Sequence, residues 1–247
     1  MKSQLHITRT RKLNYINMKL DLTIPTDLNE ITLGQYQQFV KVKETTNDNE
    51  MLAEKMIQIF CGIELKEIVN IKFTEVKKLV EHFNKLFSET PKFVPTFKIK
   101  DMEFGFIPDL QNISFGEYVD LEENLKSWDT YHKAMAVMYR PIKQKVKGGH
   151  ELIEYTGTAE FSDLMKFAPL GVTLSSSVFF WNLGSELLQS TIHYLEQEIT
   201  KNPKVLEILA KQHNFQNNGV GISQFMHSLK EMSANLTKLP HWDYLNV

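Results

Sequence analysis

The sequence predicts a mainly α-helical protein with small antiparallel β-hairpins, an α+β fold. Three observations predict this class: a helix-start pattern that occurs twice, apolar residues at helical spacing along most of the chain, and short alternating runs joined by turn residues. With 247 residues, the chain is long enough to bury a sizeable core as one large domain or two small ones. A disulfide framework is excluded because there is one cysteine.

The first observation is an internal repeat. The segment 27–36, DLNEITLGQY, aligns with the segment 109–118, DLQNISFGEY, which lies 82 residues further along the chain. An Ile-Pro pair precedes both segments, at Ile24-Pro25 and at Ile107-Pro108. Since repeats of this kind dictate architecture, we expect an internally duplicated strand-turn-capped-helix unit.

Both copies carry a helix-capping signal. Thr32 with Gln35, and Ser114 with Glu117, have the spacing S/T-x-x-E/Q of a capping box, in which each side chain bonds the other residue's backbone N–H. The isoleucine before each cap is placed to pack on the tyrosine in the first helical turn. We therefore expect helices to start directly after Thr32 and Ser114.

A glycine follows each cap at the same position, Gly34 and Gly116. Glycine weakens a helix, so we expect another backbone to approach closely at both positions, inside the fold or across an interface. These glycines and the tyrosines next to them, Tyr36 and Tyr118, are candidate interface residues.

The remaining elements follow in chain order. Alternation predicts strands at 20–24 and a hairpin of 96–100 with 103–107. Apolar spacing predicts helices over 51–60, over 76–87 with Thr74 as cap, and over 128–139. A hairpin with Gly148-Gly149 at its turn is expected over 142–155. Helices at 159–167 and 172–199, a short helix after Asn202, and an amphipathic helix after Gly221 complete the chain.

These elements suggest four regions. Residues 1–17 read as a basic N-terminal arm, because they hold four Lys and Arg residues and no carboxylate. Residues 18–100 form the first repeat unit, and 101–199 the second, with the lysine hairpin 142–155 and the long apolar helix. Residues 200–247 form a helical tail after a joint near 212–221, whose polar, glycine-containing composition predicts flexibility.

Charge and hydropathy narrow the function classes. The chain has 28 Lys and Arg against 30 Asp and Glu, so it lacks the basic excess of a general nucleic-acid binder. Polar residues interrupt the apolar stretch 172–188 before it reaches the roughly 20 residues that span a bilayer, so no membrane segment is expected. The N-terminus also lacks the apolar core of a secretory signal.

No catalytic template is present. Cys61 lies in an apolar run and reads as a small buried hydrophobe. Asp129 and His132 are three residues apart but lack the further ligands that a metal site requires. The carboxylates of Asp120, Glu122 and Glu123 fit a solvated helix face better than acid–base chemistry. We therefore expect no enzyme activity, no cofactor and no metal.

Two regions look suited to contacts with partners. Lys143, Lys145 and Lys147 alternate along the hairpin and are expected on one face, where they could hold an acidic protein or a nucleic-acid backbone; equally, they could only solubilise an edge strand. The last helix and the end of the chain, with Phe225 and Trp242, are placed to dock on another surface.

Several segments resemble those of small proteins from the structural gene cassettes of tailed bacteriophages, especially phages of gut Bacteroidetes. The resemblance spans roughly residues 18 to 199, and its segments are IPTDLNEITLGQY (24–36), FGFIP (104–108), FGEYVDL (115–121) and FFWNLG (179–184). It implies tail or head-to-tail assembly, as a tail assembly chaperone or a connector component. It also implies phage structural proteins or further copies of the chain as partners, and a location in the bacterial host cytoplasm during assembly or in the virion. It transfers no functional residues.

The sequence leaves two other classes open. A nucleic-acid-associated protein would use the basic hairpin, and its binding would be sensitive to salt. An enzyme would gather His132, Asp129 and nearby carboxylates in a concave pocket. The leading hypothesis is a non-enzymatic phage assembly or virion protein.

Overall fold

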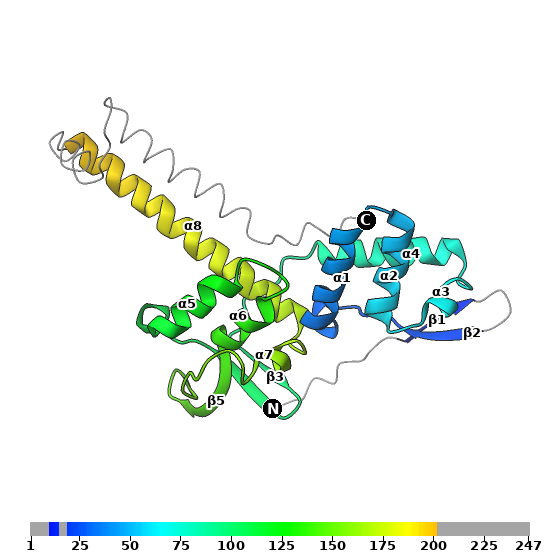
Figure 1. Ribbon diagram of the computed structural model, residues 1–247, viewed down its shortest axis with the longest axis horizontal. Coiled ribbons are helices and arrows are strands. Elements are labelled where there is room, and N and C mark those ends of the chain that lie inside the picture. Colours follow the sequence, from blue (N-terminus) through cyan, green and yellow to red (C-terminus); the bar gives the residue numbers. More distant parts are fainter. Residues whose placement is uncertain (1–9, 15–18, 202–247) are drawn as a thin grey trace. The chain divides into compact units, whose positions relative to one another are not determined.

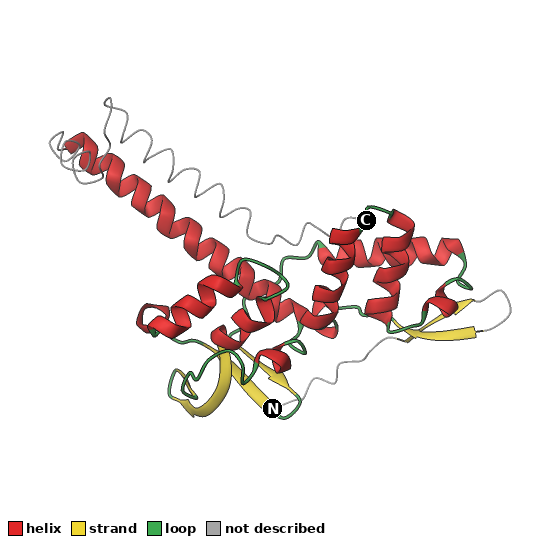
Figure 2. Ribbon diagram, in the orientation of Figure 1, coloured by secondary structure: helices red, strands yellow, loops and turns green. Residues whose placement is uncertain are grey.

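The computed structural model describes residues 10–14 and 19–201. The chain forms two compact units, of which the first runs to Ser176 and the second begins at Ser177. The predicted division at residue 100 is not a division of the fold, because it falls inside a β-hairpin and both predicted repeat units contribute to the first compact unit. Figures 1 and 2 show the helices and the two small sheets of this α+β fold.

The first hairpin pairs strand β1 (Thr10–Asn14) with strand β2 (Lys19–Thr23) in antiparallel register, Thr10 opposite Thr23. Five residues of the predicted N-terminal arm are therefore part of a sheet, which corrects the interpretation of 1–17 as an arm apart from the fold. The reason is that an isolated β2 would leave its backbone groups unpaired.

A helical layer follows: the short 3₁₀-helix η1 (Leu28–Glu30), then helices α1 (Leu33–Thr45), α2 (Asn49–Cys61), α3 (Leu65–Ile68) and α4 (Phe73–Phe87). Its core is aromatic. The ring of Phe60 lies 5.4 Å from Phe39, 5.5 Å from Phe83 and 5.2 Å from Phe87, measured between centroids. Helix α2 ends as predicted at Gly62, which has a φ of 68°. The predicted cap at Thr74 is wrong, because the N-cap residue of α4 is Lys72, two residues earlier, and Thr74 lies inside the helix.

The central sheet has four antiparallel strands in the order β3-β4-β5-β6, with bounds β3 Thr96–Ile99, β4 Met102–Phe106, β5 Tyr139–Val146 and β6 Gly149–Leu152. On β3, Phe97 and Ile99 are buried and Lys98 is exposed, as the alternation predicts. Nε2 of His150 on β6 donates to the Phe106 carbonyl oxygen on β4, 2.8 Å away. The His150 ring crosses Gly105 so closely that a Cβ there would lie 2.4 Å from Nε2.

The lysine hairpin forms, but its lysines do not share one face. Residues Ile142 and Leu152 are paired, and the next pair is Gln144 with Glu151, so Lys143 is an extra residue in β5. Such a bulge shifts the alternation and separates Lys143 from Lys145. Lys147 lies in the turn, which consists of Lys147 and Gly148 and not of the two glycines. The prediction of a single lysine face is therefore wrong.

The second capped helix begins at the same place in its copy as the first. The 3₁₀-helix η2 (Leu110–Asn112) precedes α5 (Phe115–Asn124), as η1 precedes α1. Both predicted capping boxes are present, at Thr32 with Gln35 and at Ser114 with Glu117. This local similarity is confirmed, but the elements that follow the two capped helices differ, so a duplication of the whole unit stays a prediction.

Helix α6 (Tyr131–Met138), the single turn α7 (Ser162–Met165) and helix α8 (Leu170–Lys201) follow. The helix predicted over 159–167 forms only as α7. The rest of that segment instead contacts α1: Leu33 N–H donates to the Ala168 carbonyl (2.9 Å), Gly34 N–H donates to the Lys166 carbonyl (2.7 Å), and Leu170 N–H donates to the Ile31 carbonyl (2.8 Å).

Helix α8 is the long apolar helix that the sequence predicts. Two of its buried serines bond to the helix itself: the Oγ of Ser175 donates to the Val172 carbonyl and that of Ser176 to the Thr173 carbonyl. Within residues 10–14 and 19–201, no helix is long and apolar enough to cross a membrane. The predicted joint at 212–221 and the helices after residue 201 lie outside the described residues.

Candidate interaction site at the start of helix α5

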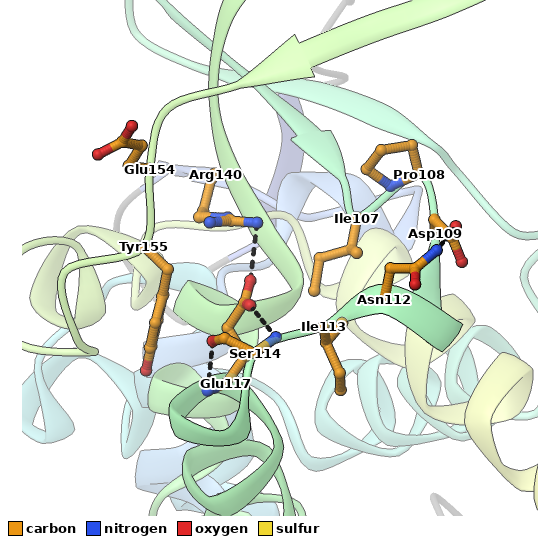
Figure 3. Close-up of a pocket in the computed structure, with 10 residues that line it drawn as sticks. All are labelled: Ile107, Pro108, Asp109, Asn112, Ile113, Ser114, Glu117, Arg140, Glu154 and Tyr155. Carbon is orange, nitrogen blue, oxygen red and sulfur yellow. Dashed lines mark hydrogen bonds and ion pairs between the residues drawn. The ribbon is translucent and has the colours of Figure 1, made fainter.

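Glu117 anchors the start of α5 from two directions. Its Oε2 accepts the Ser114 backbone N–H at 2.7 Å, and the Ser114 hydroxyl in return accepts the Glu117 N–H at 3.2 Å. Its other oxygen, Oε1, lies 2.8 Å from Nη2 of Arg140 on β5, as Figure 3 shows. The side chains of Arg140 and Glu117 are only 13% and 7% exposed, so this ion pair fixes the first turn of α5 to the sheet.

Tyr155 closes the other side of this anchor. The Arg140 guanidinium lies 5.8 Å from the centre of the Tyr155 ring, within the range of a cation–π interaction. The Tyr155 hydroxyl donates to Oδ2 of Asp120, one turn further along α5. Burial, and then the hydrogen bond to Asp120, hold the pKa of Tyr155 well above its usual value, so this hydroxyl stays a donor.

An open cavity of about 520 Å³ lies over this anchor. It is lined by residues from the β4–α5 connection, from α5, and from the chain around β5 and β6, drawn in Figure 3: Ile107, Pro108, Asp109, Asn112, Ile113, Ser114, Glu117, Arg140, Glu154 and Tyr155. The one cation, Arg140, is already paired with Glu117, while Asp109 and Glu154 add negative charge. The cavity therefore favours a cationic group over an anion.

The opposite side of α5 is apolar and exposed. Phe115 is 81% exposed, Tyr118 53% and Val119 39%. They occupy positions i, i+3 and i+4 and therefore form one stripe along the helix. We call these three residues the α5 stripe. Phe115 is the most exposed of the large apolar side chains in the described part of the chain.

The corresponding face of α1 is fully covered. Leu33 and Tyr36, which align with Phe115 and Tyr118, are 0% exposed. The Tyr36 ring packs edge-on against Trp128 at 4.9 Å, and the side-chain amide of Gln37 donates to the Trp128 carbonyl at 2.5 Å. The same helix face is thus a core surface in one copy and a free surface in the other.

The glycines that follow the two caps also differ in their surroundings, with Gly34 tightly packed and Gly116 loosely packed. A Cβ on Gly34 would lie 3.0 Å from the Lys166 carbonyl oxygen, so the predicted approach of another backbone is confirmed there, inside the fold. A Cβ on Gly116 would meet only the Tyr155 ring edge at 3.9 Å, an ordinary contact. No other backbone approaches Gly116 among the described residues, so an approach across an interface stays a prediction.

The other predicted interface residues have different outcomes. Tyr36 is buried in the chain's own core and cannot face a partner, which corrects its assignment. Tyr118 is exposed, on the α5 stripe. Lys143 and Lys147 are exposed, and Lys145 forms an ion pair with Glu103 at 2.9 Å. Phe225 and Trp242 lie outside the described residues.

The residues considered for metal or acid–base chemistry have structural partners. Asp129 pairs with Lys41 at 3.1 Å, and Nδ1 of His132 lies 3.0 Å from the amide nitrogen of Gln37. No group of three or more potential metal ligands occurs among the described residues. Cys61 is buried, as the sequence predicts, and burial raises the pKa of its thiol to about 12.

Three important residues escaped the sequence reasoning. Arg140 lies within an apolar stretch just before Pro141, and a charge there is a signal for a buried ion pair. Phe115 aligns with Leu33, an apolar residue of the first copy, so the sequence pattern carries no sign that the two differ in exposure. Tyr155 had no signal, because only the turn of the chain after β6 brings it to Asp120.

Comparison of the chain with protein-family models, with curated proteins and with solved structures found no match.

Proposed function

We propose that this chain is a non-enzymatic morphogenesis protein of a tailed bacteriophage that acts through protein–protein contacts, as a tail assembly chaperone or a component of the head-to-tail connector. It would act in the bacterial host cytoplasm during assembly or as part of the virion. One observation carries the proposal: the α5 stripe exposes the helix face that the first copy buries. The phage assignment itself comes from the sequence resemblance.

The exposure of the α5 stripe supports a contact surface, because keeping large apolar side chains in water forgoes the free energy that their burial would contribute. Burying a phenylalanine side chain contributes about 1.5–3 kcal/mol, and a soluble chain gains nothing by holding it in water. The stripe is also held rigid, since the back of α5 is fixed by the capping box, the Arg140 pair and the Tyr155 bond to Asp120. An aromatic side chain on a rigid helix loses little entropy on binding, as at interface hot spots.

The cavity begins at the same helical turn as the stripe, because Ser114 and Glu117 line it and Phe115 lies between them in the sequence. Its acidic rim, from Asp109 and Glu154, could receive a lysine or arginine of a partner. The site thus combines an apolar contact surface, the α5 stripe, with a cavity whose acidic rim prefers a cation. Such a combination suits recognition of a protein partner.

Site-specific photo-crosslinking tests the proposal. A photoreactive phenylalanine analogue replaces Phe115 in the full chain, which is co-expressed with the products of the genes that flank its own. We expect a light-dependent protein adduct at this position. The matched control carries the analogue at Lys98, an exposed residue of β3 away from α5, and forms no such adduct.

Either of two results would overturn the proposal. One is no adduct at Phe115 with any structural protein or with the chain itself, and the other is equal adducts at Phe115 and Lys98. A Phe115→Ser chain without the analogue distinguishes binding from chance proximity. This variant should no longer co-purify with the protein that forms the adduct.

A nucleic-acid-associated protein is the second candidate, favoured by the exposed lysines at 143 and 147. It predicts DNA binding that weakens steeply with salt and is lost when the three hairpin lysines are replaced. The bulge and the pairing of Lys145 with Glu103 leave this surface less concentrated than the sequence suggests.

A further inference from the structure

A second exposed apolar surface lies on the first compact unit, where α3 leads into α4. Val69 is 70% exposed, Phe73 is 67% exposed, and Leu65 one turn before Val69 is exposed as well. We call these three residues the α3–α4 patch. Backbone bonds hold the turn between the helices, such as Val69 N–H to the Leu65 carbonyl at 3.2 Å and Ile71 N–H to the Ile68 carbonyl at 2.8 Å.

The two apolar surfaces carry opposite charge at their edges. The α5 stripe continues into Glu122, which pairs with Lys126 at 3.4 Å, and into Glu123, which has no ion-pair partner among the described residues. Beside the α3–α4 patch lie Lys72, which is exposed, and Lys77, whose Nζ lies 5.1 Å from the centre of the Phe73 ring. Each apolar surface therefore ends in the charge that complements the other.

The α5 stripe and the α3–α4 patch do not bury each other within one chain. Figure 1 shows α3 and α5 at opposite ends of the compact unit that ends at Ser176. Complementary surfaces at opposite ends of one molecule pair between copies in a heterologous contact, which repeats from copy to copy until it closes. A symmetric contact between two α5 stripes would instead bring together two edges that each hold Glu122 and Glu123 against a single cation, Lys126, which already pairs with Glu122.

We propose, resting on the function proposed above, that the partner of the α5 stripe is a second copy of this chain, bound through the α3–α4 patch. Phe115 of one copy packs on Val69 and Phe73 of the next, and Glu123 meets Lys72. The contact reproduces between chains what Tyr36 and Leu33 already have inside the chain, an apolar cover over the first turns of the capped helix.

Sedimentation velocity of the purified full chain tests this arrangement. The wild-type chain is expected to self-associate with concentration. Phe115→Asp and Phe73→Asp should each weaken association at least about 30-fold, because each removes an aromatic anchor from one half of the contact. Both residues are exposed, so the variants are expected to keep the wild-type circular dichroism and urea midpoint, which checks that they fold.

Mixing the two variants gives the decisive readout. In a heterologous contact, the Phe115→Asp chain keeps an intact α3–α4 patch and the Phe73→Asp chain keeps an intact α5 stripe, so the mixture forms a 1:1 dimer that neither variant forms alone. Charge reversal gives a second test: Glu123→Lys and Lys72→Glu weaken association singly, and the two variants mixed recover it.

Three results would overturn the inference: a wild-type chain that stays monomeric, a Phe73→Asp chain that associates like wild type, or a mixture that does not pair. The first result together with a Phe115 adduct to another structural protein would leave the proposed function standing. Self-association through both surfaces together with a Phe115 adduct to the chain itself would support both proposals.

Discussion

Replacing the glycine after each helix cap by alanine offers the sharpest test of how differently the two copies are used. Alanine at a helical glycine position gains about 0.5–1 kcal/mol from propensity and from a less flexible unfolded chain. At Gly116 the added Cβ finds an ordinary contact 3.9 Å from Tyr155. Gly116→Ala should therefore stabilise the protein by up to about 1 kcal/mol.

At Gly34 the same change meets a backbone. The added Cβ would lie 3.0 Å from the Lys166 carbonyl oxygen and 3.3 Å from the Lys166 Cβ. That oxygen also accepts the Gly34 N–H at 2.7 Å, so relief of the clash stretches a hydrogen bond. Overpacking costs about 1–3 kcal/mol, and a weakened hydrogen bond adds about 1 kcal/mol. After the propensity gain of about 0.5–1 kcal/mol, Gly34→Ala should lose roughly 1–3 kcal/mol of stability.

Urea denaturation followed by tryptophan fluorescence measures both variants, because Trp128 packs against Tyr36 next to the Gly34 contact. At an unchanged m-value, the midpoint should rise for Gly116→Ala and fall for Gly34→Ala. Equal shifts, or a more stable Gly34→Ala chain, would refute the assignment of one capped helix to the core and the other to the surface.

Three further predictions concern buried groups. Arg140→Met should cost about 3–5 kcal/mol in urea denaturation because it leaves Glu117 buried without its cation, whereas Lys126→Met at an exposed pair should cost under about 1 kcal/mol; similar losses would argue against a buried pair. Burial, then the charges of Lys166 and Lys133, lower the pKa of His132 in the fold, against an opposing effect of Asp163. As pH falls below about 6.5, His132 binds a proton more readily in the unfolded chain than in the fold, so the free energy of unfolding should decrease there. A His132→Gln chain whose free energy of unfolding decreases as steeply as that of the wild type over this pH range would contradict this. The Cys61 thiol should not react with a disulfide reagent at pH 8 until denaturant is added, and rapid native labelling would show that it is accessible.

Much of the local structure could be predicted, because it depends on neighbours in the sequence. The capping boxes at Thr32 and Ser114, the stop of α2 at Gly62 and the alternation of β3 are set by residues within a few positions of each other. The β-bulge at Lys143 could not be predicted in this way, because it depends on how β5 pairs with β4 and β6. It moved one lysine out of the expected row.

The sequence by itself determined that two helices start with the same cap, followed by the same glycine and tyrosine, since capping is a local hydrogen-bonding problem. Only the tertiary structure decided what each helix does. Among the described residues, the segment Lys166–Leu170 and the Trp128 ring lie against the start of α1. Within the described residues the corresponding face of α5 is exposed, because apolar cover depends on contacts between residues far apart in the sequence and not on the local capping pattern.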